Sequence, residues 1–172
     1  ARRRVADVLQ PDGQSPAALD GKPAQKLAEQ LLEEAGFTIE SRNRRIPHTA
    51  VAVSLVARDA DGATWFFDVC GAFTSYRGGL LRTDAVWKCL GRASALKQAR
   101  GTVPLVLLST HLPQRPSEPH TALHAAGPDA FFDAVDMLSS ESLNRLAVYA
   151  KGGYTGNPQP GFWSPQELRR DR

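Results

Sequence analysis

An aspartate inside an apolar stretch is the residue of this chain best suited to acid or metal chemistry. Asp68 follows the run Trp65–Phe67 and precedes Val69. Carboxylates are seldom buried without a partner. One interpretation gives Asp68 a metal-binding or proton-transfer role. The other makes it a structural acid paired with Arg82, Lys88 or a backbone amine.

A β-hairpin is expected to position Asp68. The segment Asp59–Gly62 ends with the dipeptide Asp61-Gly62 and separates two β-rich runs, 50–58 and 63–73. Such a pattern is a strong hairpin signal. A three-residue loop would set the pairing so that Ser54 lies across from Asp68, with both side chains on one face of the sheet.

The other elements follow from hydrophobic periodicity and capping signals. Their order predicts an α/β fold with a mixed central sheet flanked by helices. We expect one domain over residues 23–152, a lead-in over 1–22 and a C-terminal tail over 153–172 that packs on the domain. The predicted helices are 23–35, 83–99, a short stretch near 123 and a last helix capped by Ser139 or Ser140, and the further strands are 37–39, 103–108 and 131–137.

This α–β–β–β–α–β order, with the hairpin as strands two and three, resembles the PD-(D/E)xK nucleases of the restriction-endonuclease-like superfamily. In that family a helix Glu, a second-strand Asp and an acid-x-Lys motif hold Mg²⁺ and activate a water. The metal neutralises charge on the phosphate and lowers the pKa of bound water. The resemblance implies that the four positions are occupied here by Gln25, Ser54, Asp68 and Cys70.

One of these four residues matches the family pattern, so the resemblance implies a degenerate or variant site. A lone carboxylate holds Mg²⁺ poorly, and Cys does not replace Lys. Glu29, one turn after Gln25, could supply the helix carboxylate, and Lys88 could supply a migrated lysine. The implied catalytic residues are Asp68, Lys88, Ser54 and Cys70, and the implied metal residues are Asp68, Gln25 and Glu29. The cofactor would be Mg²⁺ or Mn²⁺ in an active enzyme and none otherwise.

Basic residues around the second predicted helix form a possible rim beside Asp68 that could contact DNA phosphates. The i, i+4 spacing of Asp84, Lys88 and Arg92 also fits a solvated ion-pair ladder. Arg44 and Arg45 lie in a second basic segment, for which a solvated face is the alternative. The predicted DNA-binding residues are Arg77, Arg82, Lys88, Arg92, Arg44 and Arg45.

Composition sets the remaining expectations. The chain has 172 residues, a formal net charge of +3 and two cysteines. Two cysteines do not make a disulfide framework or a zinc site, which favours a reducing cytoplasm. No run approaches the roughly 20 apolar residues of a membrane span, so no membrane partner is expected.

Two functions remain open from the sequence. The first is a DNA-engaging nuclease-fold domain of a restriction, defence or repair system, which if active is a Mg²⁺-dependent endodeoxyribonuclease. The second is a non-catalytic DNA-binding or protein-docking module attached to a methyltransferase, a helicase or another partner, within a longer multidomain chain. An intact set of metal-binding residues around Asp68 would favour the enzyme, and its absence would favour the non-catalytic module.

Overall fold

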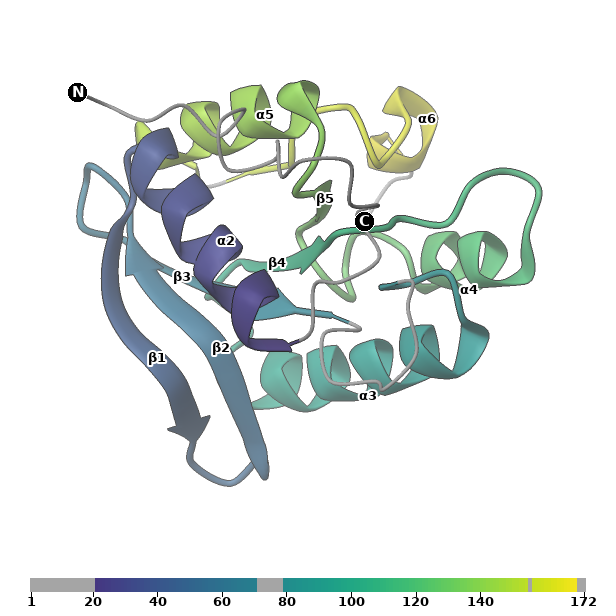
Figure 1. Cartoon of the computed structure of the whole chain (residues 1–172), viewed down its shortest axis with the longest axis horizontal. Coiled ribbons are helices and arrows are strands. Elements are labelled where there is room, and N and C mark those ends of the chain that lie inside the picture. The colour runs from purple at the N-terminus through teal and green to yellow at the C-terminus, as the bar shows by residue number, and fades with distance from the viewer. Residues whose placement is uncertain (1–20, 71–78, 155, 170–172) are drawn as a thin grey trace.

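The protein is a mixed five-stranded sheet with helices on both faces (Figure 1). The structure, a computed structural model, describes residues 21–70, 79–154 and 156–169. The strands are β1 (Thr38–Ile46), β2 (Val51–Arg58), β3 (Thr64–Val69), β4 (Leu105–Ser109) and β5 (Asp133–Asp136). The helices are α2 (Gly21–Ala35), α3 (Thr83–Arg100), α4 (Glu118–Ala126), α5 (Ser140–Ala150) and α6 (Pro165–Leu168).

The strands lie in the sheet in chain order, from β1 to β5. The β1–β2 and β2–β3 pairs are antiparallel, whereas the β3–β4 and β4–β5 pairs are parallel. The parallel connections cross over through α3 and α4, as parallel neighbours require. The predicted α/β class and mixed sheet are therefore confirmed.

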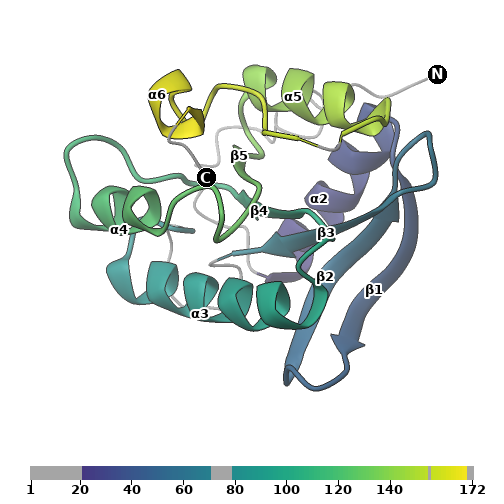
Figure 2. The same ribbon diagram turned by 180° about the vertical axis from the view of Figure 1, so that it is seen from behind.

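Two hydrophobic cores lie on opposite faces of the sheet (Figure 2). One is formed with α2 and α5, and includes Leu31, Trp65, Phe67 and Tyr149. The other is formed with α3 and α4, and includes Phe66, Val86, Leu107 and Leu123. Neighbouring residues of β3 thus serve different cores, as alternation along a strand dictates. Trp163, in the expected tail, is fully buried in the second core.

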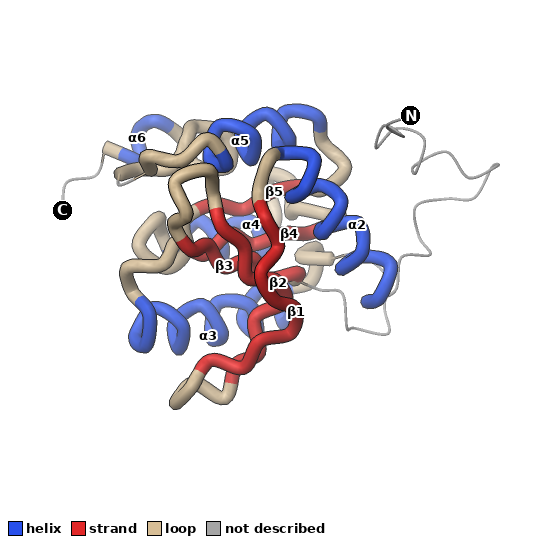
Figure 3. The backbone as a smooth tube through the Cα atoms, turned by 90° about the vertical axis from the view of Figure 1, so that its left-hand side faces the viewer, coloured by secondary structure: helices blue, strands red, loops and turns tan. Residues whose placement is uncertain are grey.

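The first strand is the largest departure from the predicted elements. A short strand at 37–39 was expected, followed by a basic segment, but β1 continues to Ile46 because it pairs along its length with β2. Arg44 lies across from Val53 and Arg45 across from Ala52. The prediction of a separate basic segment was therefore wrong. The far end of the β1–β2 ribbon projects beyond α3 (Figure 3).

The observed boundaries of the other elements differ from the predicted ones by a few residues. The first helix begins at Gly21, inside the expected lead-in, and the strand expected over 131–137 is limited to β5. Ser139 is the N-cap residue of α5. None of the helices in the described ranges combines the length and apolar character needed to cross a membrane.

Candidate functional site

Asp68 is a buried acid on β3, with 2% of its surface exposed. Leu55 pairs with Phe67 in the β2–β3 register, so Ser54 lies across from Asp68. The Ser54 hydroxyl donates a hydrogen bond to Asp68 Oδ1 at 3.1 Å and accepts one from the Val69 amide at 3.0 Å. The predicted register, with both side chains on one face of adjacent antiparallel strands, is confirmed.

The partner of Asp68 is Arg92, one of the residues expected on the DNA-binding rim. Arg92 Nε donates to Asp68 Oδ2 and Nη2 donates to Oδ1, both at 2.9 Å. Nη2 also donates to the Ala52 carbonyl at 2.6 Å. The hydrogen bonds to the Asp68 carboxylate raise the pKa of the Arg92 guanidinium above its usual value, against the effect of burial. This bidentate pair is among the strongest geometries that a carboxylate forms with a side chain.

The structural interpretation named Arg82, Lys88 or a backbone amine as the partner of Asp68, and that prediction was wrong, because the partner is the side chain of Arg92. Arg82 pairs instead with Asp84 at 3.0 Å on the exposed start of α3. The Lys88 side chain is exposed, one helical turn before Arg92. The turn of α3 that carries Arg92 lies over β2 and β3, and this places the guanidinium rather than the Lys88 amine against Asp68.

The two residues proposed from the first helix do not add a carboxylate to Asp68. Gln25 Nε2 donates to the Ser54 carbonyl at 3.3 Å, so it contacts the site through the backbone. Glu29 pairs with Arg42 at 3.0 Å. Within residues 21–70, 79–154 and 156–169, the group of potential metal ligands that includes Asp68 contains no second carboxylate.

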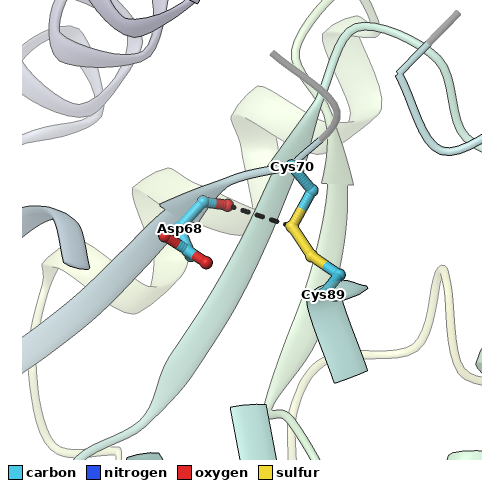
Figure 4. A group of neighbouring side chains, drawn as sticks. All are labelled: Asp68, Cys70 and Cys89. Atoms are coloured by element: carbon cyan, nitrogen blue, oxygen red, sulfur yellow. Dashed lines mark hydrogen bonds between the residues drawn. A yellow bond between two sulfur atoms is a disulfide. The ribbon is translucent and has the colours of Figure 1, made fainter. Parts of the chain in front are cut away.

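Two sulfur atoms lie beside the aspartate. Cys70 directly follows β3 and is bonded through sulfur to Cys89 of α3, with their Cα atoms 6.2 Å apart (Figure 4). Cys70 Sγ lies 3.6 Å from the Asp68 carbonyl oxygen. The expectation that the cysteines form no disulfide was therefore wrong, and the inference of a reducing compartment loses the observation on which it depended.

Three of the residues expected to bind DNA are exposed on β1 and α3. Arg44 and Arg45 are exposed on β1, and Lys88 is exposed on α3. Arg45 lies across from Ala52, whose carbonyl binds Arg92, so Arg45 and Lys88 flank the Asp68 site, whereas Arg44 faces the opposite side of β1. Arg92 itself is engaged inside the site. Arg77 lies outside the described residues.

Another buried aspartate, Asp133, was missed by the sequence analysis. Asp133 of β5 is fully buried and accepts hydrogen bonds from Arg145 Nε at 3.0 Å and from the Tyr149 hydroxyl at 2.8 Å. Burial raises the pKa of Asp133, although Arg145 opposes the shift. The signal was available, because Asp133 follows two phenylalanines as Asp68 does. Both Arg145 and Tyr149 come from α5, so the network joins that helix to the sheet.

Comparison with known proteins gives limited similarity. No protein-family model matches the chain, and no curated protein matches it. A chain of the solved EndoMS–dsDNA2 complex is similar over 73% of this chain and 47% of that chain, with 21% sequence identity and a TM-score of 0.43. The present chain therefore spans about half the length of that chain.

Proposed function

We propose that this chain is a DNA-binding domain with a restriction-endonuclease-like fold, in which an internal ion pair occupies the place of the catalytic metal. It would act within a restriction, defence or repair system as a module that binds DNA without cutting it. The observation that carries the proposal is the bidentate contact of Arg92 with Asp68.

The residues around Asp68 do not fit Mg²⁺. Mg²⁺ requires near-octahedral oxygen ligands and gives up its waters reluctantly. Asp68 is the one carboxylate in the described ligand group, whose other two members offer sulfur rather than oxygen, and the paired Arg92 brings a positive charge to the same position. The Arg92 guanidinium supplies the positive charge that a metal would otherwise supply. We therefore expect no Mg²⁺-dependent hydrolysis.

The surface next to this site supports binding to a polyanion. Arg45 of β1 is exposed across from Ala52, and Lys88 of α3 is exposed one turn from Arg92. In the described ranges neither side chain has an ion-pair partner closer than 4.0 Å. Arg44 is a further exposed cation on β1, on the opposite face of the strand from Arg45. Phosphate contacts of this kind position a protein on DNA without reading its sequence.

Salt dependence tests the proposal. Binding of the whole chain to a labelled duplex is measured by fluorescence anisotropy over a series of salt concentrations. Each phosphate contact adds about 0.9 to the slope of log affinity against log salt. Arg45→Gln with Lys88→Gln should therefore lower the slope by about 1.8. When Mg²⁺ is added to the same samples, the duplex should not be cleaved.

A matched control removes two charges from the other end of β2. Arg58, at the end of β2, pairs with Glu40, and Lys151 follows α5 beside the β2–β3 turn, where the Ala150 carbonyl binds the Ala60 amide. Arg58→Gln with Lys151→Gln should leave the slope unchanged. Equal effects of the two double variants, or no binding at low salt, would overturn the proposed interface.

Two exposed apolar side chains near the start of α3 favour the docking module as a second candidate. Trp87 is 59% exposed and Leu81 is 47% exposed, both at the N-terminal end of α3. Large apolar side chains of this exposure are typical of protein contacts when they cluster. Absence of DNA binding, together with a shift of Trp87 fluorescence on addition of a partner domain, would favour docking over DNA binding.

A further inference from the structure

The paired cysteines and Asp68 form a compact group of soft and hard ligands. One oxygen of Asp68 and the sulfurs of Cys70 and Cys89 all lie within 4.8 Å of one another, and all three residues are buried. Figure 4 shows Asp68 and Cys70 on one strand end and Cys89 on the facing helix. We infer that reduction of the Cys70–Cys89 bond converts this group into a zinc site with two thiolates and one carboxylate.

The spacing of the backbone explains why the three side chains meet. Asp68 and Cys70 are two residues apart and share one face of the strand end. Cys89 and Arg92 are three residues apart and share one face of α3. The strand end and the helix are therefore joined twice, by Asp68 with Arg92 and by Cys70 with Cys89. Opening one connection leaves the other to hold the two elements together.

The dimensions of the group suit a tetrahedral ion. Zinc binds sulfur at about 2.3 Å and carboxylate oxygen at about 2.0–2.2 Å. Ligand atoms on one tetrahedral zinc ion are therefore roughly 3.5–3.8 Å apart. The observed group lies within 4.8 Å, so small side-chain rotations suffice once the sulfurs separate. Three protein ligands leave the fourth position open to water or another small ligand.

Asp68 keeps an acceptor position for the metal. A carboxylate offers about four lone-pair positions on its two oxygens. Oδ1 accepts from Arg92 Nη2 and from the Ser54 hydroxyl, whereas the one donor to Oδ2 among these contacts is Arg92 Nε. Oδ2 can thus bind zinc while Arg92 remains in place as a hydrogen-bonding partner of the ligand, as such partners commonly orient carboxylate ligands.

Charge balance holds in both states. With the disulfide, the Asp68 carboxylate is neutralised by the Arg92 guanidinium. With zinc, two thiolates and one carboxylate balance the zinc ion and the same guanidinium. Neither state leaves a net charge in the buried group, where desolvation would destabilise it. A soft thiolate site also selects against Mg²⁺.

The interconversion is a two-electron exchange. Two thiols of the glutathione class reduce the sulfur–sulfur bond to two thiols and are themselves joined as one disulfide. In vitro a phosphine does the same with one water, which supplies the oxygen of the phosphine oxide and the hydrogens of the two thiols. Zinc binding then releases the two thiol protons to the buffer. This inference depends on the geometry at Asp68 and is tested without DNA, so its failure and the failure of DNA binding are distinguishable.

Cobalt spectroscopy tests the site. The whole chain is reduced with a phosphine, and the phosphine is removed under anaerobic conditions. The reduced chain is then titrated with Co²⁺. We expect one equivalent to give a thiolate-to-cobalt charge-transfer band and the visible bands of tetrahedral cobalt, both lost on addition of Zn²⁺. The unreduced chain should give neither band. A reduced, folded chain that shows no such bands would overturn the inference.

Variants assign the ligands. Cys89→Ser should abolish the two-thiolate spectrum, and Asp68→Asn should weaken cobalt binding at least tenfold while keeping the charge-transfer band. Asp84→Asn, which removes an exposed acid at the start of the same helix, is the matched control and should bind as the unmodified chain does. Unchanged affinity in Asp68→Asn would exclude the carboxylate as a ligand.

A measurement on the unmodified chain covers the case in which a variant fails to fold. Zinc should slow alkylation of the reduced Cys70 and Cys89 thiols by iodoacetamide more than tenfold, because bound thiolates are not free to react. The sites are read by mass spectrometry of peptides. Equal alkylation rates with and without zinc would contradict the proposed site.

Discussion

Replacing Arg92 by methionine would leave the Asp68 carboxylate buried with the Ser54 hydroxyl as its remaining side-chain donor. The change removes two hydrogen bonds to Asp68 and one to the Ala52 carbonyl. Removing one partner of a buried ion pair costs about 3–5 kcal/mol. The Arg92 side chain is 31% exposed, so water can reach the vacated position and the lower end of that range, about 3 kcal/mol, is expected.

The double-mutant cycle separates the ion pair from simple loss of packing. Asp68→Leu alone leaves Arg92 able to turn towards solvent and should cost about 1–2 kcal/mol. The double variant Asp68→Leu with Arg92→Met replaces the pair by apolar groups, and should lie within about 1 kcal/mol of the unmodified chain. The coupling between the positions should therefore be favourable by at least about 3 kcal/mol, because the two single costs together exceed the cost of the double variant by that amount.

Urea unfolding followed by fluorescence of the buried Trp65 and Trp163 measures these free energies. All chains are compared with the Cys70–Cys89 bond intact, and unchanged m-values show that the midpoint reports stability. Arg82→Met, which breaks an exposed pair, should not shift the midpoint measurably. Additive effects of the two single substitutions would refute the claim that Arg92 neutralises Asp68.

Two further predictions concern other parts of the fold. Burial, with the charges of His124 and Arg115 adding to its effect, lowers the pKa of His120 below 6.5. The folded state therefore binds fewer protons than the unfolded state, and stability should fall as the pH drops below 6.5. The fall in Tm between about pH 7.5 and 5.5 should be smaller in His120→Gln, and parallel falls in the two chains would contradict this. Gly79 has a φ of +54°, and an added Cβ would meet the Ser109 hydroxyl and lie 3.0 Å from the backbone N and O of His111. Gly79→Ala should therefore lower the free energy of unfolding in urea by about 1–3 kcal/mol. An unchanged urea midpoint would count against this close approach.

The part of the site that follows from local rules could be predicted from the sequence. The turn after Asp59 fixes the β2–β3 register, and alternation then places Ser54 opposite Asp68 without reference to the rest of the chain. The Asp59 carboxylate itself holds this turn by accepting from the amides of Asp61 and Ala63. The short turn likewise predicted that β2 and β3 are antiparallel, because it permits no other pairing.

The contacts that decide the chemistry depend on where α3 crosses the sheet, and no local rule fixes that position. Lys88 and Arg92 belong to the same helix and differ by one turn, so periodicity alone could not tell which of them reaches Asp68. The same crossing brings Cys89 to Cys70, a contact that the count of two cysteines could not predict. Lys88 and Arg92 are about 6 Å apart along the axis of α3. This distance decides whether the amine of a nuclease-like lysine or a neutralising guanidinium lies at Asp68. The placement of this one helix is what favours a binding domain over a Mg²⁺-dependent enzyme.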